Sequence, residues 1–373
     1  MRAYLKNIDW LMVGSAFLIS LGGLVTMYGF GNASSFASHQ VIWIGLGLAV
    51  FFAASALDFR FLRRTSVVVA AYVVALGFLA LLFAVGSVFK GAKSWFNLGA
   101  FAVEPVDPAK LALILVLSKY FSRRHIEIAH FRHIAVSGAY TFFMFVLLFL
   151  QPDLGGALII AALWIAMVLI AGIPFRRLAL IIAAGVAVIA LAWIFALHPY
   201  QKERIITFLH PLADISGAGY NAFQSTVAVG SGGLFGKGIG YGTQSRLQFL
   251  PEHQTDFIFA SFAEEWGFVG TLILLALFGL LIYRLVENAR LGATNFETFF
   301  TLGTASLFMI HGIIHIGMNI GILPVTGVPL PFMSYGGSHI VTSYALLGIV
   351  NAMRRYGRAV HEDERHELVG VGA

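Results

Sequence analysis

The residues of this sequence that are best suited to chemistry are carboxylates and cations at the edges of long apolar runs. A long polar segment, residues 198–256, ends in Asp256 just where an apolar run begins, with Thr255 as the predicted helix N-cap. Glu252 precedes Asp256, and Glu264 follows inside the apolar run. A carboxylate at such an edge can act as a general base. It can also simply complement a helix dipole, and this second interpretation stays open for Asp256.

Glu264 extends the polar character of this edge into the apolar run. If the helix begins near residue 256, Glu264 lies about 12 Å deeper, at ~1.5 Å per residue. A carboxylate inside a membrane span is costly and usually faces a polar cavity or an opposite charge. We therefore predict a polar cleft with Asp256 at its mouth, and we count Glu252 and Glu264 as candidates for substrate binding.

A second group of charges stands at the start of another apolar run. Asp107 and Lys110 are three residues apart, so on a helix they share one face. Lys110 would offer positive charge to an anionic lipid headgroup while Asp107 holds it in place. The alternative is a local ion pair, with Lys110 extending toward the membrane surface. Asp153 either caps a helix or joins the same group, since it falls on the same side of the membrane.

These charges are rare in a chain that is mostly apolar. Of its 373 residues, 59% are hydrophobic and 11% are charged, and the mean hydropathy is +0.85. Several apolar runs reach the ~20 residues that a helix needs to cross a bilayer. We predict an all-α, polytopic membrane protein with a single domain over residues 1–373. About ten spans are expected, near residues 11–30, 40–57, 66–89, 107–121, 133–150, 155–172, 177–197, 257–283, 297–323 and 336–353.

Basic residues are unevenly distributed over the gaps between these spans. They occupy the N-terminal segment and every second gap, whereas the opposite short gaps hold only Lys90 and Lys93. The positive-inside rule then places both termini in the cytoplasm and segments 90–106 and 198–256 outside. The net charge of +6 therefore indicates orientation and not nucleic-acid binding. No cleavable signal peptide is expected, and residues 361–373 are predicted to be disordered.

Two further patterns are typical of ligand sites but do not fit them. The glycine-rich segment 230–240 lacks the Ser or Thr that a P-loop requires after Lys237, so we interpret it as a tight loop whose backbone can approach a ligand. His311 and His315 are four residues apart but lack the H-E-x-x-H pattern. Hydrogen bonds between helices explain them better. No metal site is predicted, and the absence of cysteine excludes thiolate ligands and disulfides.

Longer motifs carry a resemblance to a known family. They cover residues 200–205, 219–225, 230–233, 242–244, 250–259, 264–267 and 324–338. In these motifs, and over most of the chain from Gly91 onward, the sequence resembles the SEDS family of bacterial cell-wall polymerases. The Gly-Thr-Gln loop at 242–244 and the short tails are more similar to the RodA branch of that family than to its FtsW branch.

The resemblance implies a peptidoglycan glycosyltransferase that polymerises lipid II during cell elongation, at the outer face of the bacterial cytoplasmic membrane. The family's catalytic aspartate matches Asp256, which would take the proton from the 4-hydroxyl of one GlcNAc. That oxygen would attack C1 of the lipid-linked MurNAc, and undecaprenyl pyrophosphate would leave. Lys110, with Arg204 or a divalent cation (Mg²⁺ or Mn²⁺), would stabilise the developing charge. The implied partner is a class B penicillin-binding protein, a transpeptidase of the elongation complex.

The chain departs from the family pattern in segment 90–106. It has Ser94-Trp95 where the family usually has Arg-Trp, and residues 104–107 read Glu-Pro-Val-Asp instead of Gln-Pro-Ser-Glu. Trp95 stays a candidate for sugar or lipid contact. Two other functions stay open: a transporter that flips lipid II, and a non-catalytic scaffold for a penicillin-binding protein. The charges cluster at the outer edge and no internal repeat is visible, which favours the enzyme over the transporter.

Overall fold

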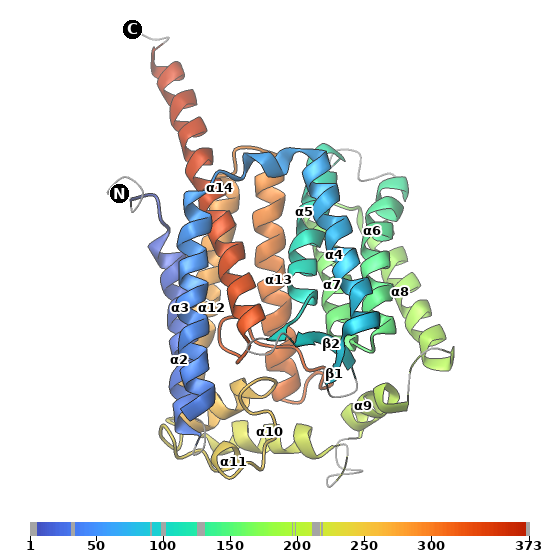
Figure 1. Cartoon of the computed structure of the whole chain (residues 1–373), viewed down its shortest axis with the longest axis vertical. Coiled ribbons are helices and arrows are strands. Elements are labelled where there is room, and N and C mark those ends of the chain that lie inside the picture. The colour runs from blue at the N-terminus through green and yellow to red at the C-terminus, as the bar shows by residue number, and fades with distance from the viewer. Residues whose placement is uncertain are drawn as a thin grey trace.

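The fold is a bundle of long helices, seen here in a computed structural model that describes residues 6–30, 34–89, 92–97, 102–124, 131–195, 197, 199–210, 217 and 219–370. The bundle helices are α2 (Trp10–Gly29), α3 (Ser34–Ala56), α4 (Thr65–Val85), α5 (Val106–Arg124), α6 (Phe131–Leu150), α7 (Leu154–Ile170), α8 (Phe175–Phe195), α12 (Ile258–Arg290), α13 (Asn295–Asn319) and α14 (Gly337–Gly370). The start of α2 and the end of α14 lie at one end of the bundle, the terminal end (Figure 1). We call the opposite end the loop end.

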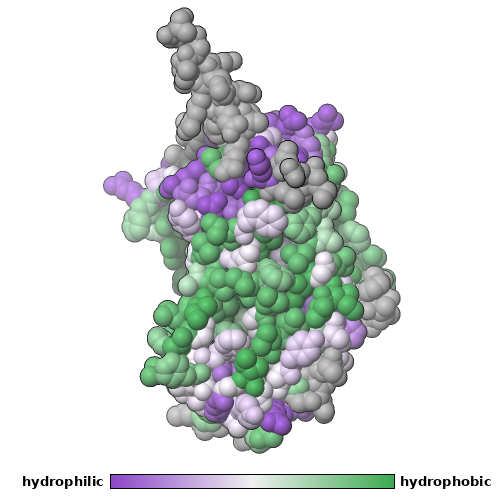
Figure 2. Space-filling model, turned by 90° about the vertical axis from the view of Figure 1, so that its left-hand side faces the viewer, coloured by the Kyte–Doolittle hydropathy of each residue, from purple (hydrophilic) through white to green (hydrophobic). Residues whose placement is uncertain are grey.

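The helical membrane class predicted from the sequence is confirmed. A described helix lies at each predicted span, and seven of these helices are long and apolar enough to cross a membrane. Figure 2 shows an apolar belt between two more polar ends. In α8 no residue is buried, so lipid can cover its whole surface. The number of helices that cross stays a prediction.

Two predictions about the segments outside the spans are wrong. The tail is not disordered as predicted, because α14 continues to Gly370. No Pro or Gly interrupts residues 358–369, so nothing in the sequence ends the helix earlier. The predicted long loop 198–256 contains three helices: α9 (Pro199–Leu209), α10 (Tyr220–Ser231) and α11 (Thr243–Arg246). These helices lie at the loop end (Figure 1).

A small antiparallel sheet follows α4 at the loop end. Its strands, β1 (Ser87–Phe89), β2 (Ala92–Asn97) and β3 (Ala102–Val103), pair in the order β1-β2-β3. The predicted span 66–89 was too long, because α4 ends at Val85 and the backbone becomes extended at Gly86. Trp95 on β2 pairs with Ser87 and is half-buried.

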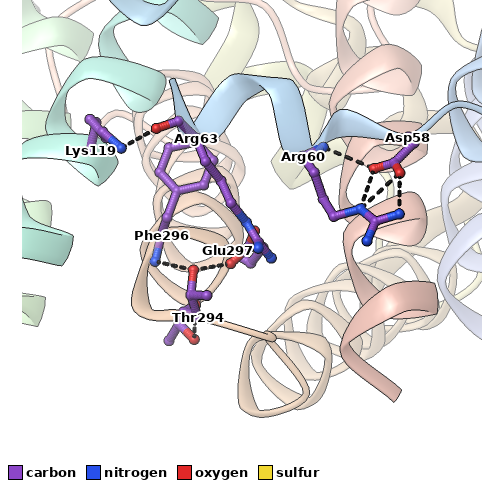
Figure 3. Close-up of polar contacts among 8 residues, drawn as sticks. Asp58, Arg60, Arg63, Lys119, Thr294, Phe296 and Glu297 are labelled. Carbon is purple, nitrogen blue, oxygen red and sulfur yellow. Dashed lines mark hydrogen bonds and ion pairs between the residues drawn. The ribbon is translucent and has the colours of Figure 1, made fainter. Parts of the chain in front are cut away.

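Ion pairs fasten the helices to one another at the terminal end. The guanidinium of Arg284 on α12 lies 2.8 Å from the carboxylate of Asp9, which caps α2. Near α4, Arg63 lies 2.6 Å from Glu297 on α13, and Lys119 of α5 donates to the Arg63 carbonyl (Figure 3). These contacts join helices that are distant in the sequence.

The helix α12 is broken at Gly267, whose backbone has φ 65° and ψ −165°. The glycine-rich segment lies against this break, and four backbone hydrogen bonds of 2.9–3.1 Å join the two. The pairs are Lys237–Glu264, Gly238–Glu265, Phe268–Gly233 and Val269–Leu234. The backbone of this segment therefore approaches α12 closely, and its approach to a ligand stays a prediction. A Cβ at Gly236 would collide with the carbonyl oxygen of Glu265.

We expect Gly236→Ala to destabilise the protein more than Gly233→Ala. Both glycines have positive φ, 80° and 56°, which costs an alanine ~1–2 kcal/mol. Only Gly236 also faces a backbone oxygen, whereas a Cβ at Gly233 would meet nothing within 4 Å. Thermal unfolding of both variants in the same detergent measures the difference. Equal losses would show that the contact between this segment and α12 adds nothing.

Candidate functional site

The connection between α13 and α14, residues 320–336, is the centre of the loop end. It is not helical, and two side chains of α13 hold its backbone. Nδ1 of His315 donates to the Val328 carbonyl at 2.7 Å, and Nδ1 of His311 donates to the Pro329 carbonyl at 3.1 Å. The histidines therefore make hydrogen bonds to the connection, and the predicted hydrogen bonds between helices are wrong in their partner. Among the described residues, no group of three His, Cys, Asp or Glu side chains is placed to hold a metal ion.

Asp256 lies in a turn and not on a helix. The helix α12 begins at Ile258, and its N-cap, Phe257, makes no side-chain cap hydrogen bond. The prediction that Thr255 caps a helix opened by Asp256 is therefore wrong by two residues. Thr255 instead donates to the Glu252 carboxylate at 3.0 Å, and Glu252 has a φ of 55°. This left-handed residue tightens the turn and delays the helix.

Contacts from two elements fix the position of Asp256. The side-chain amide of Asn319, at the end of α13, donates to the Asp256 carbonyl at 3.1 Å. The hydroxyl of Ser334, in the connection, donates to the Thr255 carbonyl at 2.8 Å. The Asp256 carboxylate faces Gly327, where an added Cβ would lie 3.7 Å from Oδ2. Asp256 is partly exposed, so its carboxylate is held in place and still accessible.

Asp107 and Lys110 form the predicted ion pair, and it is buried. Nζ of Lys110 lies 3.2 Å from Oδ1 of Asp107, and their side chains are only 4% and 3% exposed. Lys110 therefore does not extend to the membrane surface. Two residues at the start of α14 complete the pair, since Ser338 and His339 contact the Asp107 carboxylate at 2.9 and 3.2 Å. A cavity of about 10 Å³ beside the pair has room for about one water.

Asp153 caps α7, which is one of the two alternatives predicted for it. Its Oδ1 accepts the N–H of Gly156 at 2.8 Å. The start of α7 packs on the connection, because a Cβ at Gly155 would lie 2.8 Å from the Thr326 carbonyl oxygen. Asp153 and Asp256 therefore both lie beside residues 326–328 of the connection. A role of Asp153 in substrate binding stays a prediction.

The charges at the loop end act on one another. Burial, then the charge of Asp107, holds the pKa of Glu104 well above its ordinary range, against the pull of Lys110. The charges of Asp153 and Asp256 add to this rise. We call Glu104, Asp107, Lys110, Asp153 and Asp256 the charge cluster. Contacts bring its segments to the connection and to the start of α14, because Asp153 and Asp256 lie beside residues 326–328 and Asp107 contacts Ser338 and His339.

Arg204 lies at the edge of this cluster. Burial raises the pKa of the Asp153 carboxyl, and Arg204 is among the charges that pull it down. Arg204 also lines an open groove of about 620 Å³ between α9, α10 and residues 320–325. The groove shares the connection with Asp256, because Val325 lines it and Gly327 faces the Asp256 carboxylate.

Glu264 and Trp95 are placed differently from the charge cluster. Glu264 is completely buried, and its carboxylate accepts from Nζ of Lys237 at 2.7 Å and from the N–H of Thr243 at 2.9 Å. It therefore holds the segment that follows α10, and the cleft predicted beside it is filled by that segment. Trp95 lies on the small sheet, whose strand β2 packs on α4.

Three residues of the site were missed from the sequence. Glu104 was quoted in the segment of Asp107 and Lys110 and as a departure from a family pattern, but not as a site residue, and Ser338 was quoted only as part of a motif. His339 follows that motif and was not considered. The available signal was its position, since an ionisable residue in the first turn of a membrane span commonly has a polar partner. Nothing in the sequence showed that this partner is Asp107.

Comparison with known proteins gives consistent matches. The profile of one family, described as cell cycle protein (FtsW, RodA and SpoVE), matches residues 2–359. Peptidoglycan glycosyltransferase MrdB of Escherichia coli K12 is 38% identical over 285 residues, 76% of this chain and 77% of MrdB. Stage V sporulation protein E of Bacillus subtilis is 36% identical over 355 residues, 93% of this chain and 94% of that protein.

Two solved structures have the same fold. One comes from a study of the structural coordination of polymerization and crosslinking by a peptidoglycan synthase complex. It has a TM-score of 0.81 and 32% identity, and the match covers 94% of this chain and 98% of that one. The other is the rod shape determining protein RodA of Thermus thermophilus, with a TM-score of 0.70 and 32% identity. That match covers 93% of this chain and 96% of RodA.

We expect Lys110→Met to lower the free energy of unfolding by about 3–5 kcal/mol, because it leaves the Asp107 charge buried without its main partner. Adding Asp107→Asn should restore most of the loss. The matched control is Arg290→Met, which breaks an i,i+3 pair of 2.8 Å whose arginine side chain is 72% exposed, and should cost under about 1 kcal/mol. Denaturant unfolding in detergent gives all three values. Additive losses in the double variant would contradict the buried pair.

We expect stability to depend on pH through Glu104. Its pKa is raised in the folded protein, so folding favours the protonated form. The stabilisation is complete below the unfolded carboxyl pKa of about 4.3 and is lost as pH rises through the folded value. Glu104→Gln keeps a neutral side chain and should flatten this loss. Thermal unfolding of both proteins across pH tests it, and parallel curves would exclude Glu104 as the source.

Proposed function

We propose that this chain, which belongs to the FtsW, RodA and SpoVE family of cell cycle proteins, is a peptidoglycan glycosyltransferase that polymerises lipid II. The observation that carries the proposal is the position of Asp256, whose turn is held by Asn319 and Ser334 and whose partly exposed carboxylate faces Gly327 of the connection. Relatives named as peptidoglycan glycosyltransferases match most of the chain, which supports the same reaction here.

The proposed setting is the bacterial cytoplasmic membrane, with the loop end outside and the terminal end in the cytoplasm. The chain is a multi-pass membrane protein. Arginines such as Arg63, Arg284 and Arg290 follow the positive-inside pattern and lie in elements of the terminal end. Lipid-linked sugars presented at the outer leaflet would then meet the charge cluster.

In the proposed reaction Asp256 is the general base. Its carboxylate takes the proton from the 4-hydroxyl of GlcNAc on one substrate as that oxygen bonds to C1 of the lipid-linked MurNAc. The bond between C1 and the phosphate oxygen breaks, and undecaprenyl pyrophosphate leaves with the electron pair. A positioned base contributes ~10²–10⁴-fold in rate. The contacts from Asn319 and Ser334 support this role, because they fix the turn that carries Asp256.

Positive charge toward the pyrophosphate would come from Lys110. Arg204, the other predicted source, lines the groove between α9 and α10 and would meet the substrate there instead. Asp107, with Ser338 and His339 behind it, would hold the Lys110 ammonium in one position. The proposal includes no obligatory cofactor. A divalent cation, Mg²⁺ or Mn²⁺, is the alternative source of positive charge and would bind with the pyrophosphate.

The other proposed substrate contacts are Asp153, Glu252 and Trp95. Asp153 and Glu252 lie beside the connection and in the turn of Asp256, respectively, so either can meet a sugar at Asp256. Trp95 would contact sugar or lipid from the small sheet. Glu264, also predicted to bind substrate, would act indirectly, by holding the segment after α10.

The proposed partner is a class B penicillin-binding protein within the elongation complex. One structural neighbour is described as a peptidoglycan synthase complex that coordinates polymerization and crosslinking, and another as a rod shape determining protein. These descriptions support an enzyme with a transpeptidase partner. They favour catalysis over the alternatives of a lipid II transporter and of a scaffold without activity.

We expect Asp256→Asn to reduce glycan polymerisation by ~10²-fold or more, because it removes the base while keeping the size of the side chain. The assay is purified protein with lipid II in detergent, read as glycan chains on a gel. This arrangement has no second compartment, so transport alone gives no product. The control is Asp58→Asn, an exposed carboxylate between α3 and α4 at the terminal end. Unchanged polymerisation by Asp256→Asn would remove Asp256 as the base.

A further inference from the structure

The groove between α9 and α10 is not explained by the reaction at Asp256. α9 presents Thr207 and Phe208 to it, and α10 presents Asn221 and Phe223. Its third side is the first part of the connection between α13 and α14, residues 320–325. Its volume, about 620 Å³, is within the range typical of sites for small organic ligands.

The position of the groove limits what it can bind. It is formed by elements that lie beyond the long helices at the loop end (Figure 1). A lipid chain would be expected along the apolar faces of the bundle, and α8 offers such a face along its whole length. The groove therefore suits a part of a substrate that lies in water.

The lining of the groove combines aromatic rings with hydrogen-bonding groups. Phe208 and Phe223 offer flat apolar surfaces for the C–H faces of sugar rings, while Thr207, Asn221 and Thr226 offer partners for hydroxyl and acetamido groups. Arg204 adds a guanidinium, which binds carboxylates such as those of a stem peptide. The lining also holds Glu203 and an apolar wall made by Ile320, Leu323, Pro324 and Val325. Its polar groups fit the hydroxyl, acetamido and peptide groups of a strand, and its apolar wall fits the C–H faces of the sugar rings.

The connection links the groove to the reacting position. Val325 lines the groove, and Gly327, two residues further, faces the Asp256 carboxylate. Two residues span at most ~7 Å of chain. A strand whose terminal sugar stands at Asp256 therefore has the groove within reach of its next units.

On the premise of the proposed function, we propose that this groove binds the lipid-free disaccharide-peptide part of a peptidoglycan strand and keeps it next to Asp256. The groove is thus a binding site for the polymer, separate from the lipid-linked end of either substrate. It holds the product of one addition in place for the next, which lengthens the strands made before release.

The first test is binding of a soluble, lipid-free disaccharide-pentapeptide to the full chain in detergent, measured by calorimetry or saturation-transfer NMR. Thr207→Trp fills the groove and should weaken binding at least ~10-fold. The control is Ile206→Trp, which places a tryptophan at the neighbouring residue of α9. Ile206 is 49% exposed and does not line the groove, so this variant should bind the fragment as tightly as the unaltered protein. Asn221→Ala removes a polar partner without adding bulk and should also weaken binding.

The outcomes separate the groove from the reaction. Asp256→Asn should bind the fragment normally, so its loss of polymerisation tests the proposed function alone. Thr207→Trp, checked for unaltered thermal unfolding, should still polymerise lipid II but release shorter strands. Fragment binding that is equal in all groove variants, or that is displaced by inorganic pyrophosphate or by undecaprenyl phosphate, would overturn the assignment of the groove to the sugar-peptide.

Discussion

The backbone of the connection between α13 and α14 has to satisfy its polar groups without forming a helix, and the arrangement of the loop end depends on how it does so. Irregular backbone at the end of a membrane bundle is stable only where protein or water supplies hydrogen bonds. Here His311 and His315 of α13 supply them. Asn319, one turn further, bonds both the Asp256 carbonyl and, through its Oδ1, the N–H of Ala260. One face of α13 thus fixes the connection and the start of α12 together.

The same constraint explains the charge cluster. A buried carboxylate is stable only with partners, and Asp107 has three: Lys110 on its own helix, and Ser338 and His339 on α14. Ser338 also exchanges hydrogen bonds with the backbone of Glu104. The resemblance gives a glutamate at the position of Asp107, and an aspartate is one methylene shorter.

The sequence was sufficient for the long helices of the bundle, but not for α9, α10 and α11 or for the contacts among the charged residues. Long apolar runs and the alternation of basic residues predicted the spans, because both follow from the cost of polar groups in lipid. They could not predict the break of α12 at Gly267, which depends on a segment some thirty residues earlier fitting against it. They also placed Asp256 on a helix, since the left-handed conformation of Glu252 leaves no pattern in residue types. Residue types also could not predict the partner of Glu264, because Lys237 is distant from it in the sequence.

The distribution of hydrogen bonds also bears on the choice between an enzyme and a transporter. A transporter moves its binding site between two sides, so the elements around the site need to separate. At this site the turn of Asp256 is bonded to α13 through Asn319 and to the connection through Ser334, and the connection is bonded to α13 again. Gly155 lets the start of α7 pack closely on the connection, since a Cβ there would lie 2.8 Å from the Thr326 carbonyl oxygen. A site fixed in this way favours catalysis, which gains from groups that are already oriented before the substrate binds.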